Sequence, residues 1–199
     1  MLTRFFDFFI SLIALVLLSP FLVIIGFIVA IESKGGALYT QVRVGKNGKD
    51  FKLLKFRTMR YNSDSKGLLT IGTRDPRVTF WGYIIRKFKI DELPQLLNVL
   101  IGDMSIVGPR PEVRKYVDLY TETQKKILKV RPGITDYASL YYIDENELLA
   151  KSENPEETYI NEVMPAKIDL NYKYIDNPTI FEYFKIIFLT AKSILFHRF

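Results

Sequence analysis

The sequence predicts an α+β protein that is mostly helical, with one N-terminal membrane helix followed by a small domain. Three observations predict this class. Residues 8–31 are 24 consecutive residues without a formal charge. Residues 42–53 alternate between apolar and polar side chains on either side of a glycine-containing turn, and several later apolar runs recur at helical spacing. We therefore divide the chain into a membrane helix at 1–33 and a folded domain at 34–199.

Composition excludes several classes of site. The net charge of +6 favours anionic partners, but it does not choose between nucleic acid, anionic lipid and phosphorylated substrate. The chain has no cysteine, which excludes a disulfide scaffold, a zinc–thiolate site and thiol catalysis. Its single histidine, His197, is third from the C-terminus and is expected to be a solvated tail residue.

The apolar segment is long enough to cross the hydrocarbon core of a membrane as a helix. A secretory signal peptide fits poorly, because Arg4 is balanced by Asp7 and no cleavage site follows. Pro20 removes a backbone donor and predicts a bend, and the Ser19 hydroxyl is placed to satisfy the freed carbonyl. Two outcomes stay open: a kinked spanning helix, which base rates favour, and a helix that enters and leaves on the same side. Residues 34–60 contain eight Lys or Arg and one acid, which places them in the cytoplasm.

The remaining elements follow from turn chemistry and apolar periodicity. Asn47-Gly48 predicts the turn of a β-hairpin, and the polar residues 61–75 predict a mobile loop. Helical spacing predicts a helix over 79–87, and a second helix runs from near Pro94 towards Leu100 and closes at Gly102.

The second half of the chain is predicted to be largely helical. A rigid loop at 108–111 precedes an expected helix at about 112–129, which Arg131-Pro-Gly133 ends. Residues 142–165 are rich in acids and predict surface helix and loop. A last helix over 180–196 either meets lipid headgroups or covers the core of the domain, with one apolar face made of Phe181, Phe184, Ile187, Phe188, Ala191 and Leu195.

Two adjacent carboxylates, Asp91 and Glu92, are the leading candidates for chemistry. They follow a cationic stretch and come just before the helix expected near Pro94, where the helix field favours anions. That field is expected to lower a carboxylate pKa and keep the group ionised, ready to attack phosphorus or to ligate Mg²⁺. Taken alone, the pair is more often an acidic helix cap that pairs with a nearby lysine.

Basic residues expected to converge on this pair suit the oxygens of a diphosphate. Proline on both sides of Arg110 fixes the backbone and reduces the entropy lost in holding that arginine. The simpler alternative is a solvated basic face near anionic lipid. The candidates for substrate binding are Lys55, Arg57, Arg77, Arg86, Pro109, Arg110, Pro111 and Arg131, with Arg74 a further basic group nearby.

Four motifs in order resemble those of the bacterial monotopic phosphoglycosyl transferases, a sugar transferase family that starts glycan assembly. They are 51–59 (Phe-Lys-Leu-Leu-Lys-Phe-Arg-Thr-Met), 91–95 (Asp-Glu-Leu-Pro-Gln), 102–111 (Gly-Asp-Met-Ser-Ile-Val-Gly-Pro-Arg-Pro) and 131–135 (Arg-Pro-Gly-Ile-Thr). The resemblance covers nearly the whole chain, including Ser19-Pro20. It implies a re-entrant helix with both ends in the cytoplasm, amphipathic interfacial helices, and a location at the cytoplasmic face of the bacterial inner membrane.

The resemblance also implies the chemistry. Asp91 would attack the sugar-bearing phosphate of a UDP-sugar and expel UMP, and polyprenyl phosphate would then displace Asp91. Glu92, beside Asp91, would hold Mg²⁺, Arg86 would bind phosphate, and the loop at 109–111 would help seat the nucleotide. The implied partners are a UDP-sugar, polyprenyl phosphate and membrane lipid, with no nucleic acid, and a homodimer is left open.

Three positions depart from or bear on the family pattern. Residues 136–139 read Asp-Tyr-Ala-Ser where the family commonly has Gly-Trp-Ala-Gln, and a position that is often Asp falls at Tyr183. Asp169 matches another frequent family acid. These differences leave the identity of the sugar undetermined. Two rivals have lower priors: a membrane-tethered interaction module, and a nucleic-acid binder, for which residues 52–60 offer a single stacking aromatic, Phe56.

Overall fold

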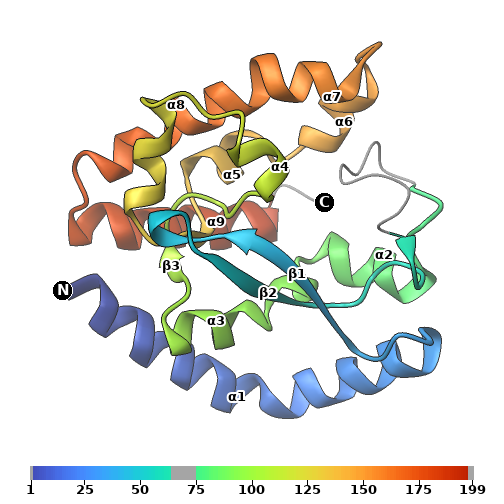
Figure 1. Cartoon of the computed structure of the whole chain (residues 1–199). Coiled ribbons are helices and arrows are strands. Elements are labelled where there is room, and N and C mark those ends of the chain that lie inside the picture. The colour runs from blue at the N-terminus through green and yellow to red at the C-terminus, as the bar shows by residue number, and fades with distance from the viewer. Residues whose placement is uncertain (1, 64–74, 197–199) are drawn as a thin grey trace.

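A long N-terminal helix lies beneath a domain of short helices and two small sheets (Figure 1). The structure is a computed structural model of the chain, and it describes residues 2–63 and 75–196. The mostly helical α+β class predicted from the sequence is confirmed. The expected loop at 61–75 lies mostly outside the described residues, as do Arg74 and His197.

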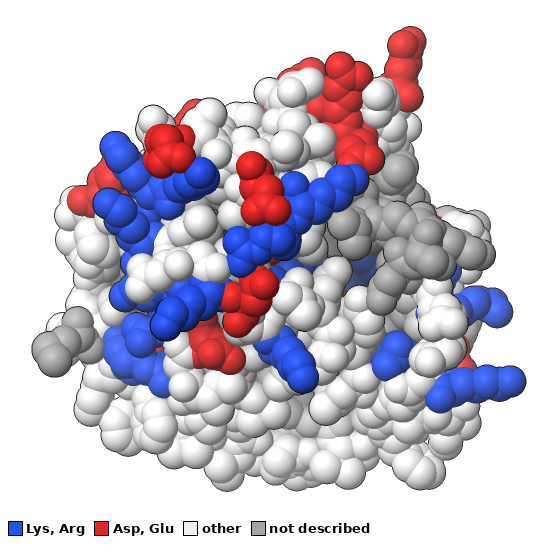
Figure 2. All heavy atoms as spheres, in the orientation of Figure 1, with Lys and Arg blue, Asp and Glu red and all other residues white. Residues whose placement is uncertain are grey.

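The N-terminal helix α1 (Leu2–Glu32) contains Pro20 and continues through it. The missing N–H of Pro20 would have bonded to the Val16 carbonyl, and the Ser19 hydroxyl donates to that carbonyl instead, at 2.8 Å. The predicted role of Ser19 is therefore confirmed. Most of α1 is exposed and apolar, and within the described residues it is the one helix long and apolar enough to cross a membrane. Figure 1 shows its axis bowed beneath the domain, and in Figure 2 the lower edge of the molecule, where the middle of α1 lies, carries no charge on this face.

The predicted hairpin is confirmed. Strands β1 (Leu38–Val44) and β2 (Asp50–Phe56) pair antiparallel, with Val42 opposite Lys52. A short 3₁₀ turn, η1 (Lys46–Gly48), joins them, and Asn47 and Gly48 have φ values of 58° and 72°. Asparagine and glycine tolerate this left-handed conformation better than other residues, which is why the pair marks the turn.

Helices α2 (Phe80–Lys87) and α3 (Gln95–Ile101) form where helical spacing predicts them. The Thr79 hydroxyl caps α2 by accepting a hydrogen bond from the Gly82 nitrogen at 3.0 Å. Gly102 follows α3 with a φ of 100°, so it closes the helix as predicted.

The single helix expected over residues 112–129 is wrong. The chain forms instead one short helix, α4 (Arg114–Val117), and a separate 3₁₀ segment, η4 (Gln124–Lys129). Thr121 and Gln124 exchange two bonds: the Thr121 nitrogen donates to the Gln124 side chain at 2.9 Å, and the Gln124 nitrogen donates to the Thr121 hydroxyl at 3.2 Å. This reciprocal capping starts a new helical segment at that point and divides the expected helix.

A second sheet was not predicted. Strands β3 (Ser105–Val107) and β4 (Gly133–Thr135) pair in parallel and are three residues each, too short for an alternating pattern to be read. Their backbones approach so closely at Gly133 that a Cβ atom there would lie 2.1 Å from the Gly108 nitrogen. The glycine of the Arg131-Pro-Gly133 turn is therefore required by packing.

The C-terminal part is helical. Residues 142–165 form short helices as expected, but Leu149 and Tyr159 from this segment are buried in the core. Helix α8 was not predicted. The elements are α5 (Tyr137–Tyr141), α6 (Glu145–Ala150), α7 (Pro155–Thr158), a π-helical turn η5 (Tyr159–Val163), α8 (Met164–Ile175) and α9 (Ile180–Phe196).

Helix α9 forms as predicted and covers the core of the domain, which is one of the two roles left open for it; contact with lipid headgroups stays a prediction. Tyr183 and Ile186 are fully buried and join the core formed with β2, α3 and β3. Phe181 and Phe188 are exposed. Ile187 of the predicted apolar face packs against this core, together with Tyr183 and Ile186, which that face did not include.

Candidate active site

The two candidate carboxylates lie in a 3₁₀ turn, η3 (Ile90–Glu92), between α2 and α3. The residue before the turn, Lys89, has a φ of 57°, a conformation that costs a non-glycine residue on the order of 1 kcal/mol or more. This left-handed residue reverses the chain after α2, and both Asp91 and Glu92 are buried. They come just before α3, as the sequence predicts.

Glu92 is held by two cations. The Arg110 guanidinium donates to both carboxylate oxygens of Glu92, with Nη1 3.1 Å from Oε2, and the Lys55 ammonium lies 3.8 Å from Oε1. Burial by itself raises the pKa of Glu92, but Arg110 and Lys55 outweigh it and hold that pKa well below its ordinary value. Glu92 is therefore a fixed negative charge.

Asp91 has the opposite environment. Its Oδ1 atom is buried and has no hydrogen-bond partner among the described residues. Burial, and secondly the neighbouring Glu92 charge, raise the pKa of Asp91 above its ordinary value. The expected lowering of a carboxylate pKa is found at Glu92, where Arg110 and Lys55 are the causes, and it is not found at Asp91.

The two cations nearest the carboxylates differ in character. Burial lowers the pKa of Lys55 to about 8, against the opposing effect of Glu92. The Glu92 charge raises the pKa of Arg110, so this arginine keeps its proton at all accessible pH values. Arg110 is a permanent cation beside Asp91, whereas Lys55 can lose its charge in mildly alkaline solution.

The loop at 109–111 is fixed at each residue. The Pro109 carbonyl accepts from the Gly133 nitrogen at 2.9 Å, and the Arg110 nitrogen donates to the Asp136 carboxylate at 2.7 Å. The Pro111 carbonyl accepts from the Arg43 guanidinium at 3.0 Å. Hydrogen bonds to other parts of the fold therefore hold this loop, in addition to the rigidity inferred from its two prolines.

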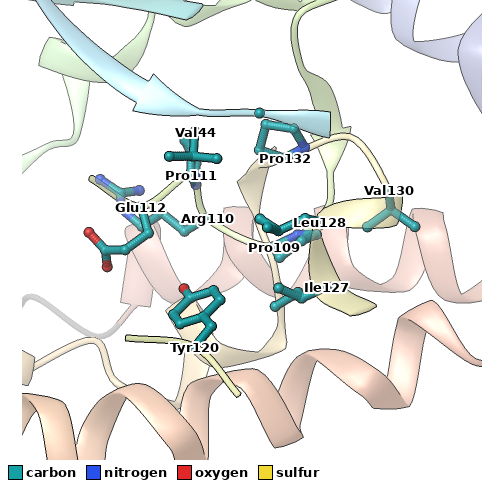
Figure 3. Close-up of a pocket in the computed structure, with 11 residues that line it drawn as sticks. Val44, Pro109, Arg110, Pro111, Glu112, Tyr120, Ile127, Leu128, Val130 and Pro132 are labelled. Carbon is teal, nitrogen blue, oxygen red and sulfur yellow. The ribbon is translucent and has the colours of Figure 1, made fainter. Parts of the chain in front are cut away.

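A small cavity lies behind this loop (Figure 3). It has a volume of about 20 Å³ and is enclosed by Val44, the loop, Tyr120 and Ile127. This is room for about one water molecule, so the cavity is too small for a substrate.

The carboxylates face a much larger cleft of about 910 Å³. One end of it is lined by the carboxylates and their cations, and here Arg86 from the last turn of α2 joins Lys55 and Arg110. Another part is apolar and includes Ile10 of α1 and Ile187 of α9. The cleft therefore joins a cationic end to apolar side chains from two helices that carry exposed apolar surface.

Three of the predicted substrate-binding arginines do not line this cleft. Arg57 donates to the carbonyls of residues 35, 36 and 38 and so ties the end of α1 to the hairpin. Arg77 forms a two-pronged pair with Asp75, which itself borders the cleft. Arg131 donates to the Gly102 carbonyl at 2.9 Å, at the end of α3. For Arg57 and Arg131 the bonding is to backbone carbonyls, and for Arg77 it is to a carboxylate.

Asp136 is one of the departures from the family pattern, and its contacts were not predicted from the sequence. One carboxylate oxygen caps α5 by accepting from the Ser139 nitrogen, and the other accepts from Arg110 and from Asn171. Its position just before a helix, where aspartate is a common cap, was the available signal. Asp169 lies on the exposed side of α8.

The side chains of this site fit a magnesium ion that is also bound by substrate phosphates and water. No group of three or more metal-ligating side chains occurs among residues 2–63 and 75–196, which leaves no cage made of protein alone. Mg²⁺ commonly binds one or two carboxylates, substrate phosphates and water. Asp91, with a buried oxygen that has no partner in the described part of the chain, suits that arrangement better than Glu92, whose two oxygens accept from Arg110.

Comparison with known proteins identifies the family of the chain. The bacterial sugar transferase family matches residues 1–197. The chain is 37% identical over 188 residues to a UDP-N-acetylgalactosamine-undecaprenyl-phosphate N-acetylgalactosaminephosphotransferase of Aeromonas hydrophila, covering 93% of this chain and 41% of that protein. It is 34% identical to the UDP-glucose:undecaprenyl-phosphate glucose-1-phosphate transferase of Escherichia coli, covering 93% of this chain and 38% of the relative.

A third relative has a similar length. The exopolysaccharide production protein PSS of Rhizobium leguminosarum is 37% identical, with 96% of this chain and 94% of that protein covered. The chain thus spans about two fifths of the first two relatives and almost all of the third. The protein belongs to the bacterial sugar transferase family.

Proposed function

We propose that this protein transfers a sugar phosphate from a UDP-sugar to polyprenyl phosphate at a membrane surface. The products are UMP and a polyprenyl-diphospho-sugar, and the reaction is the first membrane step in the assembly of a glycan. The names of the relatives support the substrate classes, since they include undecaprenyl-phosphate transferases for N-acetylgalactosamine phosphate and glucose 1-phosphate.

One observation carries the mechanism. Within residues 2–63 and 75–196, a buried carboxylate oxygen of Asp91 has no hydrogen-bond partner, and Asp91 lines the cleft together with the cations. A buried acceptor left unpaired costs about 1–3 kcal/mol, which a stable fold tolerates most readily where a ligand completes the site. The neighbouring Glu92 forms an ion pair with Arg110, so its carboxylate is the less available nucleophile of the two.

In the first step an Asp91 oxygen attacks the sugar-bearing phosphorus of the UDP-sugar. A phosphorus–oxygen bond forms to Asp91, and the bond from that phosphorus to the bridging oxygen breaks. The electron pair leaves with UMP, and the sugar phosphate stays on Asp91 as a mixed anhydride. In the second step an oxygen of polyprenyl phosphate attacks the same phosphorus and the Asp91 carboxylate is released.

The cations serve the diphosphate. Arg110, Lys55 and Arg86 line the same end of the cleft and offer charge-assisted bonds to phosphate oxygens. Glu92 holds Arg110 in place, so its main contribution is to orient that guanidinium. A magnesium ion, when bound at Asp91 and the diphosphate, would neutralise charge on the phosphate oxygens.

The placement of α1 supports a re-entrant helix at the cytoplasmic face of the bacterial inner membrane. Near its start, Arg4 donates to the carbonyls of Val99 and Leu100, and at its end Glu32 accepts from the Trp81 nitrogen at 3.2 Å. A helix of 31 residues is about 46 Å long, more than the ~30 Å hydrocarbon core. Because both ends contact one domain, a path that enters and leaves on the same side fits better than a span. The excess of Lys and Arg over residues 34–60 supports the assignment of that side to the cytoplasm.

The proposal is tested by UMP release from a panel of UDP-sugars with undecaprenyl phosphate in lipid nanodiscs. We expect release with at least one sugar, and a covalent adduct on the wild-type protein whose intact mass exceeds that of the free chain by one phosphosugar. Asp91→Asn is expected to lose both signals. Asp118→Asn, an exposed carboxylate on the same domain, is the matched control and should keep both.

Two results would overturn parts of the proposal. Absence of UMP release with every sugar would reject the transferase and favour a membrane-tethered interaction module. An adduct that persists in Asp91→Asn would reject Asp91 as the nucleophile. A Mg²⁺ titration unchanged in Asp91→Asn under binding conditions would remove the metal from this residue.

A further inference from the structure

Asp7 in the second turn of α1 is a buried carboxylate satisfied by neutral donors from two other elements. Its side chain accepts from the Ser105 hydroxyl at 2.9–3.0 Å, from the Ile106 nitrogen at 2.9 Å and from the Tyr183 hydroxyl at 2.9 Å. The residue is 2% exposed. Leaving an ionisable group in such a place is expensive unless its bonds are all made, so each of these contacts matters to the local geometry.

The strand that Asp7 contacts has few backbone hydrogen bonds, although its side chains pack in the core. Strand β3 is three residues long and pairs only with β4, which is equally short. A two-stranded sheet of this size is not stable by itself. The outer edge of β3 receives its contact from Asp7, which accepts the Ile106 N–H that no strand pairs with.

This strand leads directly into the loop that carries Arg110. Arg110 is the fourth residue after Ile106, and the loop begins where β3 ends. Arg110 in turn determines the state of Glu92 through its two-pronged bond. A displacement of β3 would therefore also move Arg110, because a short and rigid loop joins the two.

The same end of α1 also contacts the element that follows the carboxylates. Arg4, one turn before Asp7, donates to the carbonyls of Val99 and Leu100 at the end of α3, with a distance of 2.8 Å to Leu100. Helix α3 begins three residues after Glu92. Two polar side chains near the start of α1 thus contact the elements on either side of the site. Arg4 contacts α3, which follows the carboxylates, and Asp7 contacts β3, which precedes Arg110.

We infer that Asp7 is a positioning residue for the transfer reaction, which sets Arg110 against Glu92 by fixing β3 to the base of the membrane helix. The inference rests on the proposed function, since it concerns the same site. It makes the active-site geometry depend on the docking of α1, in addition to the role of α1 as an anchor.

The test compares three variants in nanodiscs. Asp7→Ala leaves the Ile106 N–H and two hydroxyls without their acceptor, and we expect kcat to fall on the order of 100-fold with little change in KM for the UDP-sugar, because a small displacement of a catalytic group has an effect of that size. Asp7→Asn keeps the shape and one acceptor oxygen, and the two hydroxyls can turn to accept, so it should restore most of the lost rate. Ser11→Ala is the matched control, because Ser11 is buried one turn away on the same helix and its hydroxyl has no partner among the described residues.

A readout independent of turnover is hydrogen exchange over residues 105–111. In Asp7→Ala these amides are expected to exchange faster, while the hairpin at residues 38–56 exchanges as in the wild type. The positioning role is overturned if folded Asp7→Ala turns over at the wild-type rate, or if its rate falls while exchange over 105–111 is unchanged. If Asp7→Ala does not fold, Tyr183→Phe decides, since it removes one of the donors: a kcat and an exchange rate equal to wild type would reject the inference. If wild type itself releases no UMP, the proposed function fails, whereas the exchange measurement still reports on Asp7.

Discussion

Arg110→Met tests how the pair of Arg110 and Glu92 organises the site. The change removes the guanidinium that donates to both Glu92 oxygens and keeps a side chain of similar reach. Glu92 is then left with Lys55, whose ammonium is 3.8 Å away, and its own side chain is 11% exposed. Removing one partner of a buried ion pair costs about 3–5 kcal/mol, and because the Arg110 side chain is 33% exposed, screening by water reduces the expected loss to about 2–3 kcal/mol at pH 7.

The loss should depend on pH in a defined direction. In the wild type the pKa of Glu92 is held below its ordinary value of 4.5, so the pair contributes stability above that pH and loses it as the pH falls through the folded pKa. In Arg110→Met the largest effect that lowers the pKa of Glu92 is removed, so burial raises that pKa. The variant should therefore fall further behind the wild type as the pH rises from 4 to 7, because burial favours a protonated Glu92 in the variant at the lower pH.

Thermal unfolding in detergent, followed by circular dichroism between pH 4 and 7, measures this. A loss of about 2–3 kcal/mol corresponds to a decrease in Tm of roughly 4–12 °C for a chain of this size. Arg114→Met is the matched control, because its pair with Asp50 is exposed and should contribute less than about 1 kcal/mol. An equal loss at pH 4 and pH 7, or no recovery in Arg110→Met combined with Glu92→Gln, would refute the reasoning.

Three further predictions concern the cations, the second sheet and the membrane helix. Because the pKa of Lys55 is about 8, kcat/KM for the UDP-sugar should fall as the pH rises through that value, and Lys55→Arg should extend the plateau; a wild-type profile that is flat to pH 10 would contradict this. Gly133→Ala places a Cβ atom 2.1 Å from the Gly108 nitrogen and should cost about 3 kcal/mol or more in thermal unfolding, whereas Gly26→Ala, with its nearest contact at 3.7 Å, should be tolerated. The chain has no cysteine, so Thr3→Cys is a unique label site; it should react with an impermeant maleimide only from the cytoplasmic side, and periplasmic labelling would indicate a spanning helix.

Local features of the fold could be predicted because single residues determine them. The hairpin turn follows from Asn47 and Gly48, which accept positive φ, and the end of α3 follows from Gly102. The Ser19 bond follows from the donor that Pro20 lacks. The helix expected over 112–129 failed for a related reason, since the capping pair within it, Thr121 and Gln124, is a local signal that the apolar periodicity concealed.

The membership of the site was only partly predictable. Asp91, Glu92, Lys55, Arg86 and Arg110 do line one cleft. A basic residue type does not reveal its partner, however. Arg57 and Arg131 bind backbone carbonyls, which the packing of the hairpin and of α3 decides, whereas Arg77 binds a carboxylate two residues away.

The sequence by itself determined the adjacency of two carboxylates, the membrane helix and the rigid arginine loop, because each is a property of residues close together in the chain. Only the tertiary structure decides which of the two carboxylates is paired with cations. Arg110 lies 18 residues from Glu92 and Lys55 lies on the hairpin, and both cations approach Glu92. Electrostatic energy depends on distances between atoms rather than on separation along the chain, so folding splits the two pKa values. It leaves Asp91 with an oxygen that has no partner in the part of the chain that the structure describes.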